Sequence, residues 1–250
     1  KRLGITGNWD NPYLTMSFDA EAQIAREVGK FLMNGGLYKG AKPVLWSVVE
    51  KTALADAEVE YHDHTSTTIY VRFPVTKTSV PALEGASIVI WTTTPWTIPG
   101  NRAVAYGEEF DYAVYEVTEI AEKSSAVVGE KIVLGSALAE AVKTAAKITG
   151  LKKIAWVKGA ELAGTIVGHP LAGKGYDFDV PVLPAEFVTL DAGSGFVHIS
   201  PGAGLDDFLL GQKHGLEIIS TVDDAGKFHD HMPLVAGMDV MEDNYKIAML

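Results

Sequence analysis

Apolar residues at helical spacing identify the first predicted element. Between residues 19 and 34 they occur at Ile24, Val28, Phe31 and Leu32. This spacing is typical of an amphipathic helix with one apolar face. Asp19 is expected to cap its start, and the Gly35-Gly36 pair is expected to end it.

The pattern then changes to short runs of β-branched and aromatic residues, separated by proline, glycine or charged turns. These runs predict strands over residues 44–49, 67–75, 87–93, 102–105, 112–117, 154–157, 187–190 and 196–199. Two further helices are predicted, over 136–148 with Ser136 as cap, and over 205–214 ending at Gly215. The pattern predicts an α+β fold, a β-barrel-like domain with several peripheral helices.

The change from a helical to a strand pattern near residues 39–49 predicts a domain boundary. We expect residues 1–45 to form a connecting segment and residues 46–250 the main domain, with its core over about 50–240. The chain begins at Lys1 rather than Met and ends at Leu250 inside an unfinished helical pattern. We therefore expect a piece excised from a longer protein.

Composition limits the function classes. The chain has 47% hydrophobic residues, ample for a core, and lacks a run of about 18 apolar residues that could span a membrane. Zero cysteines exclude disulfides and cysteine nucleophiles, and fit a reducing compartment. The net charge of −11 argues against a domain that holds nucleic acid by neutralising phosphates.

A dense run of hydroxyl side chains follows a predicted buried strand. WTTTPWTIPGN occupies residues 91–101, directly after three apolar residues. Pro95 removes a ladder donor and restricts Thr94 to an extended backbone, so the strand is expected to end there. Threonine hydroxyls at a strand end can orient a substrate or a water molecule. The alternative is that these threonines only favour strand geometry.

The second candidate segment is DAGSGFVHISPGAGLDDF, residues 191–208, where a strand enters a glycine-rich loop and then a helix. Side chains and backbone amides converge at such loops. His198 could donate to a carbonyl or steer water, and Asp207 could pair with a substrate ammonium. The alternatives are a satisfied core histidine, and carboxylates at Asp206 and Asp207 that only complement the helix dipole.

Two short sequences have the spacing of metal ligands: His62-Asp63-His64 and His229-Asp230-His231. Alternate strand residues share a face, so each histidine pair could chelate. Both lie in polar, turn-like stretches without an evident third ligand, and we predict no metal site. The sequence also lacks a phosphate-binding GxxxxGK[ST] loop and a GxSxG nucleophile elbow.

Together, the two dense segments resemble the signature segments of the editing insertion of isoleucyl-tRNA synthetases, a class I family. The resemblance continues through GNWDNPYLTM (7–16), NGGLYKGAKPVLWS (34–47) and ALADAEVEY (53–61), and so covers most of the chain. Valyl and leucyl relatives carry Thr-Thr-Arg-Pro where this chain has Thr93-Thr94-Pro95-Trp96, which selects the isoleucyl branch. The HIGH and KMSKS signatures of the synthetic site do not occur.

The resemblance implies that residues 1–45 are the edge of the synthetase core, and it implies a role for each site residue. Catalytic roles fall to Thr92, Thr93, Thr94, His198 and Asp207, and substrate-binding roles to Trp91, Asn101, Gly202 and Asp206. The family often has a Cys-x-x-Cys zinc knuckle after the position of Trp46. This chain has Ser47 and Glu50 in place of the two cysteines, so no zinc is expected. Ala203 stands where many bacterial relatives have His, which removes a side-chain role at that position.

The implied activity is post-transfer hydrolysis of Val-tRNA(Ile) in a small second-sieve pocket, with pre-transfer hydrolysis of valyl-adenylate as a further route. No cofactor is expected in this chain, since ATP and Mg²⁺ belong to the parent's synthetic site. The expected partners are the 3′ acceptor end of tRNA(Ile) carrying valine and the rest of the synthetase, in the cytoplasm. The alternative is a non-catalytic inserted module that binds the tRNA acceptor end or a protein. If the editing assignment holds, the two dense segments should face one cleft.

Overall fold

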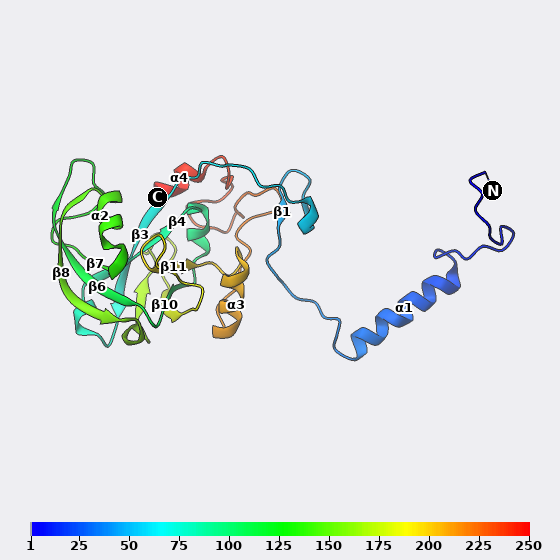
Figure 1. Ribbon diagram of the computed structural model, residues 1–250, viewed down its shortest axis with the longest axis horizontal. Helices are drawn as coiled ribbons and strands as arrows, with labels where there is room; N and C mark the ends of the chain where they lie inside the picture. The colour runs from blue at the N-terminus through cyan, green and yellow to red at the C-terminus, as the bar shows by residue number, and fades with distance from the viewer. Residues whose placement is uncertain (1) are drawn as a thin grey trace. The chain divides into compact units, whose positions relative to one another are not determined.

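The computed structural model describes residues 2–250 and divides the chain into two compact units, Lys1–Ala41 and Lys42–Leu250, drawn in Figure 1. The predicted first helix is confirmed in the first unit as α1 (Phe18–Met33). Its N-cap is Ser17 rather than Asp19, because Ser17 has the extended backbone and its carbonyl accepts the Glu21 N–H. Within the described chain, no α1 residue is buried.

The second unit is built on a mixed nine-stranded sheet with the order β11-β5-β10-β9-β3-β4-β7-β6-β8. Its strands are β3 (Ile69–Lys77), β4 (Ala86–Thr92), β5 (Ala103–Tyr106), β6 (Asp111–Ile120), β7 (Lys131–Gly135), β8 (Ile148–Lys158), β9 (Ile166–Gly168), β10 (Asp179–Pro184) and β11 (Phe196–Ile199). The β5–β10 and β4–β7 pairs are parallel, and the other pairs are antiparallel. A separate hairpin pairs β1 (Trp46–Ser47) with β2 (Thr52–Ala53).

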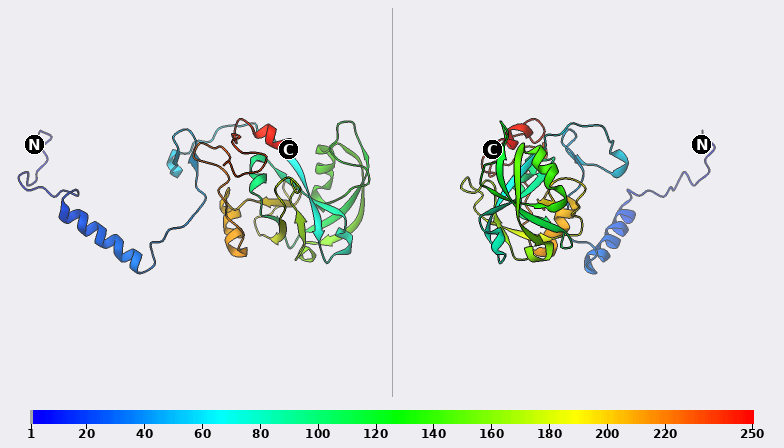
Figure 2. Two further views of the ribbon diagram at one scale, coloured as in Figure 1. Left: turned by 180° about the vertical axis from the view of Figure 1, so that it is seen from behind. Right: turned by 60° about the vertical axis from the view of Figure 1, so that its left-hand side comes forward.

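Helices surround this sheet. They are α2 (Ala139–Ala145), α3 (Leu205–His214) and α4 (Asn244–Ala248), with the 3₁₀ turns η1 (Asp56–Glu58), η2 (Pro81–Leu83), η3 (Pro95–Gly100), η4 (Ser136–Leu138) and η5 (Gly159–Leu162). In Figure 1 and in the reverse view of Figure 2, α2 and α3 lie on opposite sides of the strands, with α2 packed against β8. Among residues 2–250, no helix is long and apolar enough to cross a membrane.

The sheet confirms the predicted combination of many strands and a few peripheral helices, but its hydrogen-bonded ladder does not close among the described residues. It runs as an open series from β11 to β8. β11 nevertheless packs beside β4, although the two are not hydrogen-bonded neighbours in that series. The sheet therefore curls back on itself, and this curl brings the end of β4 close to β11.

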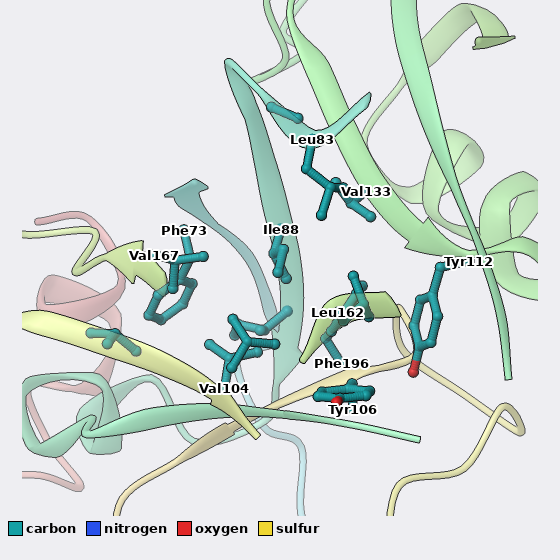
Figure 3. Close-up of a cluster of buried hydrophobic side chains, with 14 of the residues drawn as sticks. Phe73, Leu83, Ile88, Val104, Tyr106, Tyr112, Val133, Leu162, Val167 and Phe196 are labelled. Carbon is teal, nitrogen blue, oxygen red and sulfur yellow. The ribbon is translucent and has the colours of Figure 1, made fainter. Parts of the chain in front are cut away.

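The core follows the two-residue period of the strands. Ile88 and Ile90 of β4 point into one apolar cluster, while Val89 points into a second cluster on the other face. In β6, Tyr112 and Val114 belong to the first cluster, shown in Figure 3. Both faces of these strands are covered by other side chains. The sequence of β4 is therefore a continuous run of apolar residues rather than an alternation of apolar and polar residues.

Further sequence predictions were wrong. Residues 187–190 form a turn rather than a strand, because Val188 is buried against β5 and β11 side chains instead of pairing in the ladder. The helix expected over 136–148 is shorter, since Ile148 pairs with Ile120 and begins β8. Ser136 does not cap it, because Ser136 lies in the preceding turn η4 and the N-cap of α2 is Leu138. The pattern also missed β7, β9 and β10, and the prolines inside β10 conceal its strand character.

Truncating the core beneath the end of β4 should destabilise the chain. Ile90 is fully buried, so Ile90→Ala should lower the free energy of unfolding by about 2–5 kcal/mol, because it leaves a cavity. Val128→Ala, at a side chain that is mostly exposed, should change it by less than about 0.5 kcal/mol. Urea unfolding followed by circular dichroism measures both. Equal effects from the two variants would contradict this description of the core.

Candidate functional site

The threonine segment forms a hydrogen-bonded turn where β4 ends. Thr92 is buried, and its Oγ1 accepts the Thr94 N–H at 3.1 Å. Thr93 and Thr94 are exposed. The Thr94 carbonyl then accepts both the backbone N–H of Thr97 (3.0 Å) and its hydroxyl (2.9 Å). Pro95 starts η3 as expected, because a proline at the first position of a turn has no N–H to satisfy.

His198 joins this turn to the second segment. Its Nε2 lies 2.8 Å from Thr97 Oγ1, and its Nδ1 lies 3.5 Å from Asn101 Nδ2. The single Thr97 proton is directed to the Thr94 carbonyl, so Thr97 accepts from His198 and Nε2 carries the imidazole proton. Nδ1 is then the acceptor for the Asn101 amide. Both ring nitrogens are thus satisfied by protein groups.

The environment keeps His198 neutral. Burial, with a smaller contribution from nearby His169, lowers the pKa of His198 to about 4. At neutral pH the ring therefore carries no charge and, in this arrangement, offers no free nitrogen as a general base. This geometry matches the alternative of a satisfied histidine, while placing the ring at the point where the two segments meet.

Asn101 is an internal anchor. It has no exposed surface, and its Nδ2 donates to the Ala103 carbonyl at 2.8 Å. That bond fixes the amide orientation, and Asn101 Oδ1 is buried without a partner within the described chain. Arg102 continues the link between the segments, because its N–H donates to the Ile199 carbonyl at 2.8 Å.

Close backbone approaches also bring the two segments together. A side-chain carbon on Gly193 would lie 3.3 Å from the Trp91 ring, and one on Gly100 would lie 2.5 Å from Ser200 Oγ. One on Gly202 would lie 2.0 Å from the Ile219 carbonyl oxygen. Glycine at 100 and 202 is therefore explained by packing, and Gly202 holds the loop against the segment that follows α3.

The two adjacent carboxylates at the start of α3 face different surroundings. Asp207 Oδ2 accepts the Ser200 N–H at 2.7 Å, which ties α3 to the end of β11. Burial raises the pKa of Asp207 to about 6; the Ser200 hydrogen bond opposes this rise, and the neighbouring Asp206 adds to it. Asp206 is exposed and lines a groove with Glu108, Glu109 and other residues of the turn after β5 and the segment after β10.

Contacts therefore link most of the predicted site. They join the turn that contains Thr92 and Thr94 to His198 and Asn101, and they place Trp91 against Gly193. Asp207 is linked to His198 less directly. Its carboxylate accepts the Ser200 N–H, and Ser200 lies two residues after His198 in the chain.

Sequence reasoning missed Thr97 and His169. Thr97 could have been found, since it stands three residues after Thr94 and can cap the same turn, whereas nothing in the sequence marks His169.

The candidate metal sequences do not gather ligands. His62 is exposed and contacts Glu60 at 3.3 Å, while the rings of His229 and His231 stack 5.4 Å apart. Within residues 2–250, no group of three potential metal ligands comes together. Ser47 and Glu50 hydrogen-bond to one another through their side chains. The absence of zinc stays a prediction, which metal analysis of chelator-washed protein tests.

Comparisons with known proteins agree on one family. The family model described as tRNA synthetases class I (I, L, M and V) matches residues 1–225. The isoleucine–tRNA ligase of Pelagibacter ubique is 51% identical over 98% of this chain and 26% of its own length. That of Gluconobacter oxydans is 49% identical over 97% of this chain and 25% of its own length. The chain thus spans about a quarter of these relatives.

Solved structures show the same fold at low identity. The crystal structure titled GlLeuRS-CP1 matches with a TM-score of 0.53 at 17% identity, over 72% of this chain and 93% of that one. The cytosolic leucyl-tRNA synthetase editing domain of P. knowlesi matches with a TM-score of 0.51 at 9% identity, over 76% of this chain and 96% of that one. The second unit therefore has the fold of these domains.

The raised pKa of Asp207 predicts a dependence of stability on pH. Its ionised form is disfavoured in the folded state, so the wild-type chain loses stability as the pH rises from about 4 through about 6. Asp207→Asn keeps an acceptor for the Ser200 N–H but cannot ionise. The melting temperature of Asp207→Asn should exceed that of wild type at pH 8, and this difference should shrink toward zero at pH 4. A difference independent of pH would contradict the assignment.

Proposed function

Because the chain belongs to the class I tRNA synthetases and matches isoleucine–tRNA ligases over almost its whole length, we propose that it hydrolyses valine mischarged onto tRNA(Ile). A pocket shaped for isoleucine rejects valine weakly, since one missing methylene is worth about 1–3 kcal/mol, a magnitude known from this enzyme family rather than derived from this chain. A second, smaller pocket can exclude isoleucine by size and hydrolyse what enters. The proposed substrate is therefore the 3′ end of Val-tRNA(Ile), with valyl-adenylate as a second substrate.

One observation carries this proposal: exposed threonines stand on a turn that is locked to a buried imidazole. Thr93 and Thr94 are exposed, while Thr92 and Thr97 hold the turn from inside. Groups fixed by surrounding hydrogen bonds can position an ester and a water molecule without reorganising during the reaction. His198 then acts in its neutral form, shaping the pocket and holding the turn rather than transferring a proton.

Asp207 supplies the charge in this proposal. At neutral pH its carboxylate is mostly ionised, since its pKa is about 6, and it would bind the free α-ammonium of the aminoacyl group. Trp91 would line the pocket, and the terminal ribose hydroxyl would assist. Asn101 is too buried to touch a ligand, so we assign it to holding His198. Isoleucine activation with ATP and Mg²⁺ would belong to the rest of a complete ligase.

A non-catalytic module that binds the tRNA acceptor end or a protein is the second candidate. The net charge of −11 favours a protein partner over an extended RNA surface. The two candidates differ in one measurable respect, because a binding module does not release valine from Val-tRNA(Ile) in single-turnover experiments with the complete ligase.

Substitutions at Asp207 should slow deacylation. A charge-assisted contact is worth about 1.5–3 kcal/mol, so Asp207→Ala in the complete ligase should reduce kcat/KM for Val-tRNA(Ile) deacylation at least about tenfold. Asp207→Asn should be slowed similarly, because it keeps the acceptor for Ser200 but lacks the charge. Isoleucine activation, measured by pyrophosphate exchange, should be unchanged in both variants.

Asp206→Ala is the matched control. We assign no substrate contact to Asp206, because this carboxylate is exposed and lines a groove that does not include the threonine turn. It should leave deacylation within about twofold of wild type. If Asp207→Asn deacylates at the wild-type rate while Asp207→Ala does not, Asp207 holds the loop and does not bind the ammonium.

The pH profile provides a separate test. The α-ammonium anchor requires ionised Asp207, so kcat/KM for deacylation should fall as the pH drops through about 6. His198, with a pKa of about 4, should not contribute an inflection in this range. Bound ammonium favours the carboxylate, so the inflection in kcat should lie at lower pH than that in kcat/KM. A profile in Asp207→Asn that keeps the wild-type inflection would contradict this assignment.

A further inference from the structure

His169 is a second buried histidine that contacts the turn after β4. It directly follows β9, and its side chain is almost completely buried. Its Nε2 lies 3.0 Å from the Ile98 carbonyl oxygen, and its Nδ1 lies 3.1 Å from the Leu171 N–H. The two histidines thus contact adjacent residues of η3, since His198 bonds Thr97 and His169 bonds Ile98.

These partners define the tautomer of His169. A backbone N–H can only donate, so Nδ1 is the acceptor and carries no proton. A carbonyl can only accept, so Nε2 carries the proton and donates to Ile98. The neutral Nε2–H imidazole satisfies both partners, and burial favours this form by lowering the pKa of His169 to about 4.

The Ile98 carbonyl connects this bond to the rest of the site. The same oxygen accepts the Asn101 N–H at 2.9 Å, and the Asn101 side chain in turn contacts His198 Nδ1 at 3.5 Å. A shift of Ile98 would therefore move Thr97 on one side and Asn101 on the other. These are the two groups that satisfy the His198 ring.

The ring of His169 is itself held in place. It stacks on Tyr176 with centroids 4.8 Å apart and planes 15° apart, and it contacts Phe178 at 5.3 Å. The Tyr176 hydroxyl donates to the Pro233 carbonyl at 2.8 Å and ties this residue to the C-terminal segment. The ring contacts and the two nitrogen hydrogen bonds together hold the imidazole, so it can fix the position of the Ile98 carbonyl.

We infer that His169 is a positioning residue that sets the threonine turn and the His198 ring through its Nε2–H bond to Ile98. This inference rests on the proposed deacylase function for its kinetic consequence. His169 itself is almost completely buried, so we assign it no contact with the substrate.

Two substitutions at His169 distinguish the loss of its hydrogen bond to Ile98 from the loss of the imidazole ring. His169→Asn retains an acceptor for the Leu171 N–H but cannot reach Ile98, whereas His169→Gln restores a donor at the former Nε2 position. In the complete ligase, kcat for Val-tRNA(Ile) deacylation should fall about tenfold in His169→Asn, with KM nearly unchanged. His169→Gln should recover to within about threefold of wild type.

Tyr176→Phe is the matched control. It removes the hydroxyl bond to Pro233 from the same aromatic stack and leaves both His169 bonds in place. It should lower the melting temperature but leave kcat at the wild-type value. A folded His169→Asn enzyme with wild-type kcat overturns the inference, and so does a His169→Gln enzyme as slow as His169→Asn.

Imidazole ¹⁵N spectra of the chain provide a readout that does not depend on editing. The chain has seven histidines, and the signal that disappears in His169→Gln identifies His169. This signal should show the Nε2–H tautomer and should not titrate between pH 5.5 and 8. His198 signals should shift in His169→Asn more than in His169→Gln. An Nδ1–H tautomer, or unchanged His198 signals, overturns the inference even if the Asn variant of the ligase fails to fold. A wild-type ligase that does not deacylate Val-tRNA(Ile), with these spectra as expected, overturns the proposed function alone.

Discussion

A buried imidazole must find a partner for each ring nitrogen inside the protein, and the site depends on how His198 meets this requirement. Its partners, Thr97 and Asn101, lie about a hundred residues earlier in the sequence and reach it because the sheet curls β11 back beside β4. An unsatisfied polar group at such depth would cost about 1–3 kcal/mol. The hydrogen bonds that stabilise this part of the core are therefore the same bonds that fix the exposed threonines.

Asp207 illustrates a conflict between stability and the proposed function. Its carboxylate is partly desolvated, and the charge needed to bind an ammonium is the form that the folded chain disfavours. A neutral amide at this position would satisfy the Ser200 N–H and remove that conflict, but it would also remove the charge. A carboxylate in this place is easier to explain by a cationic ligand than by packing.

The charge of the chain restricts how a tRNA could bind. With a net charge of −11, and with Glu108, Glu109 and Asp206 lining the groove beside α3, this surface repels phosphates. The proposed function accordingly needs only the short 3′ end of a tRNA at the threonine turn. Most of the affinity for tRNA would come from the rest of a complete ligase, which is consistent with a chain that spans about a quarter of its relatives.

The elements whose signal is local could be predicted from the amino-acid sequence. Helical spacing located α1 and α3, β-branched runs located β3, β4, β6 and β11, and Pro95 marked the end of β4. It also identified both segments of the candidate site, because each carries an unusual density of hydroxyl, glycine or charged residues. It failed where a strand contains prolines, as in β10, and where Val188 is buried without pairing in a strand.

Which side chains of those segments are exposed and which are internal depends on tertiary packing. Asn101 and His198 read as ligand-binding residues in the sequence, yet they are buried partners of one another. His169 is an ordinary residue in the sequence and a central one in the fold, because its role comes from the sheet order that places the end of β9 beside η3. Local patterns encode elements, whereas such partners are set by which strands become neighbours, and that depends on packing across the whole chain.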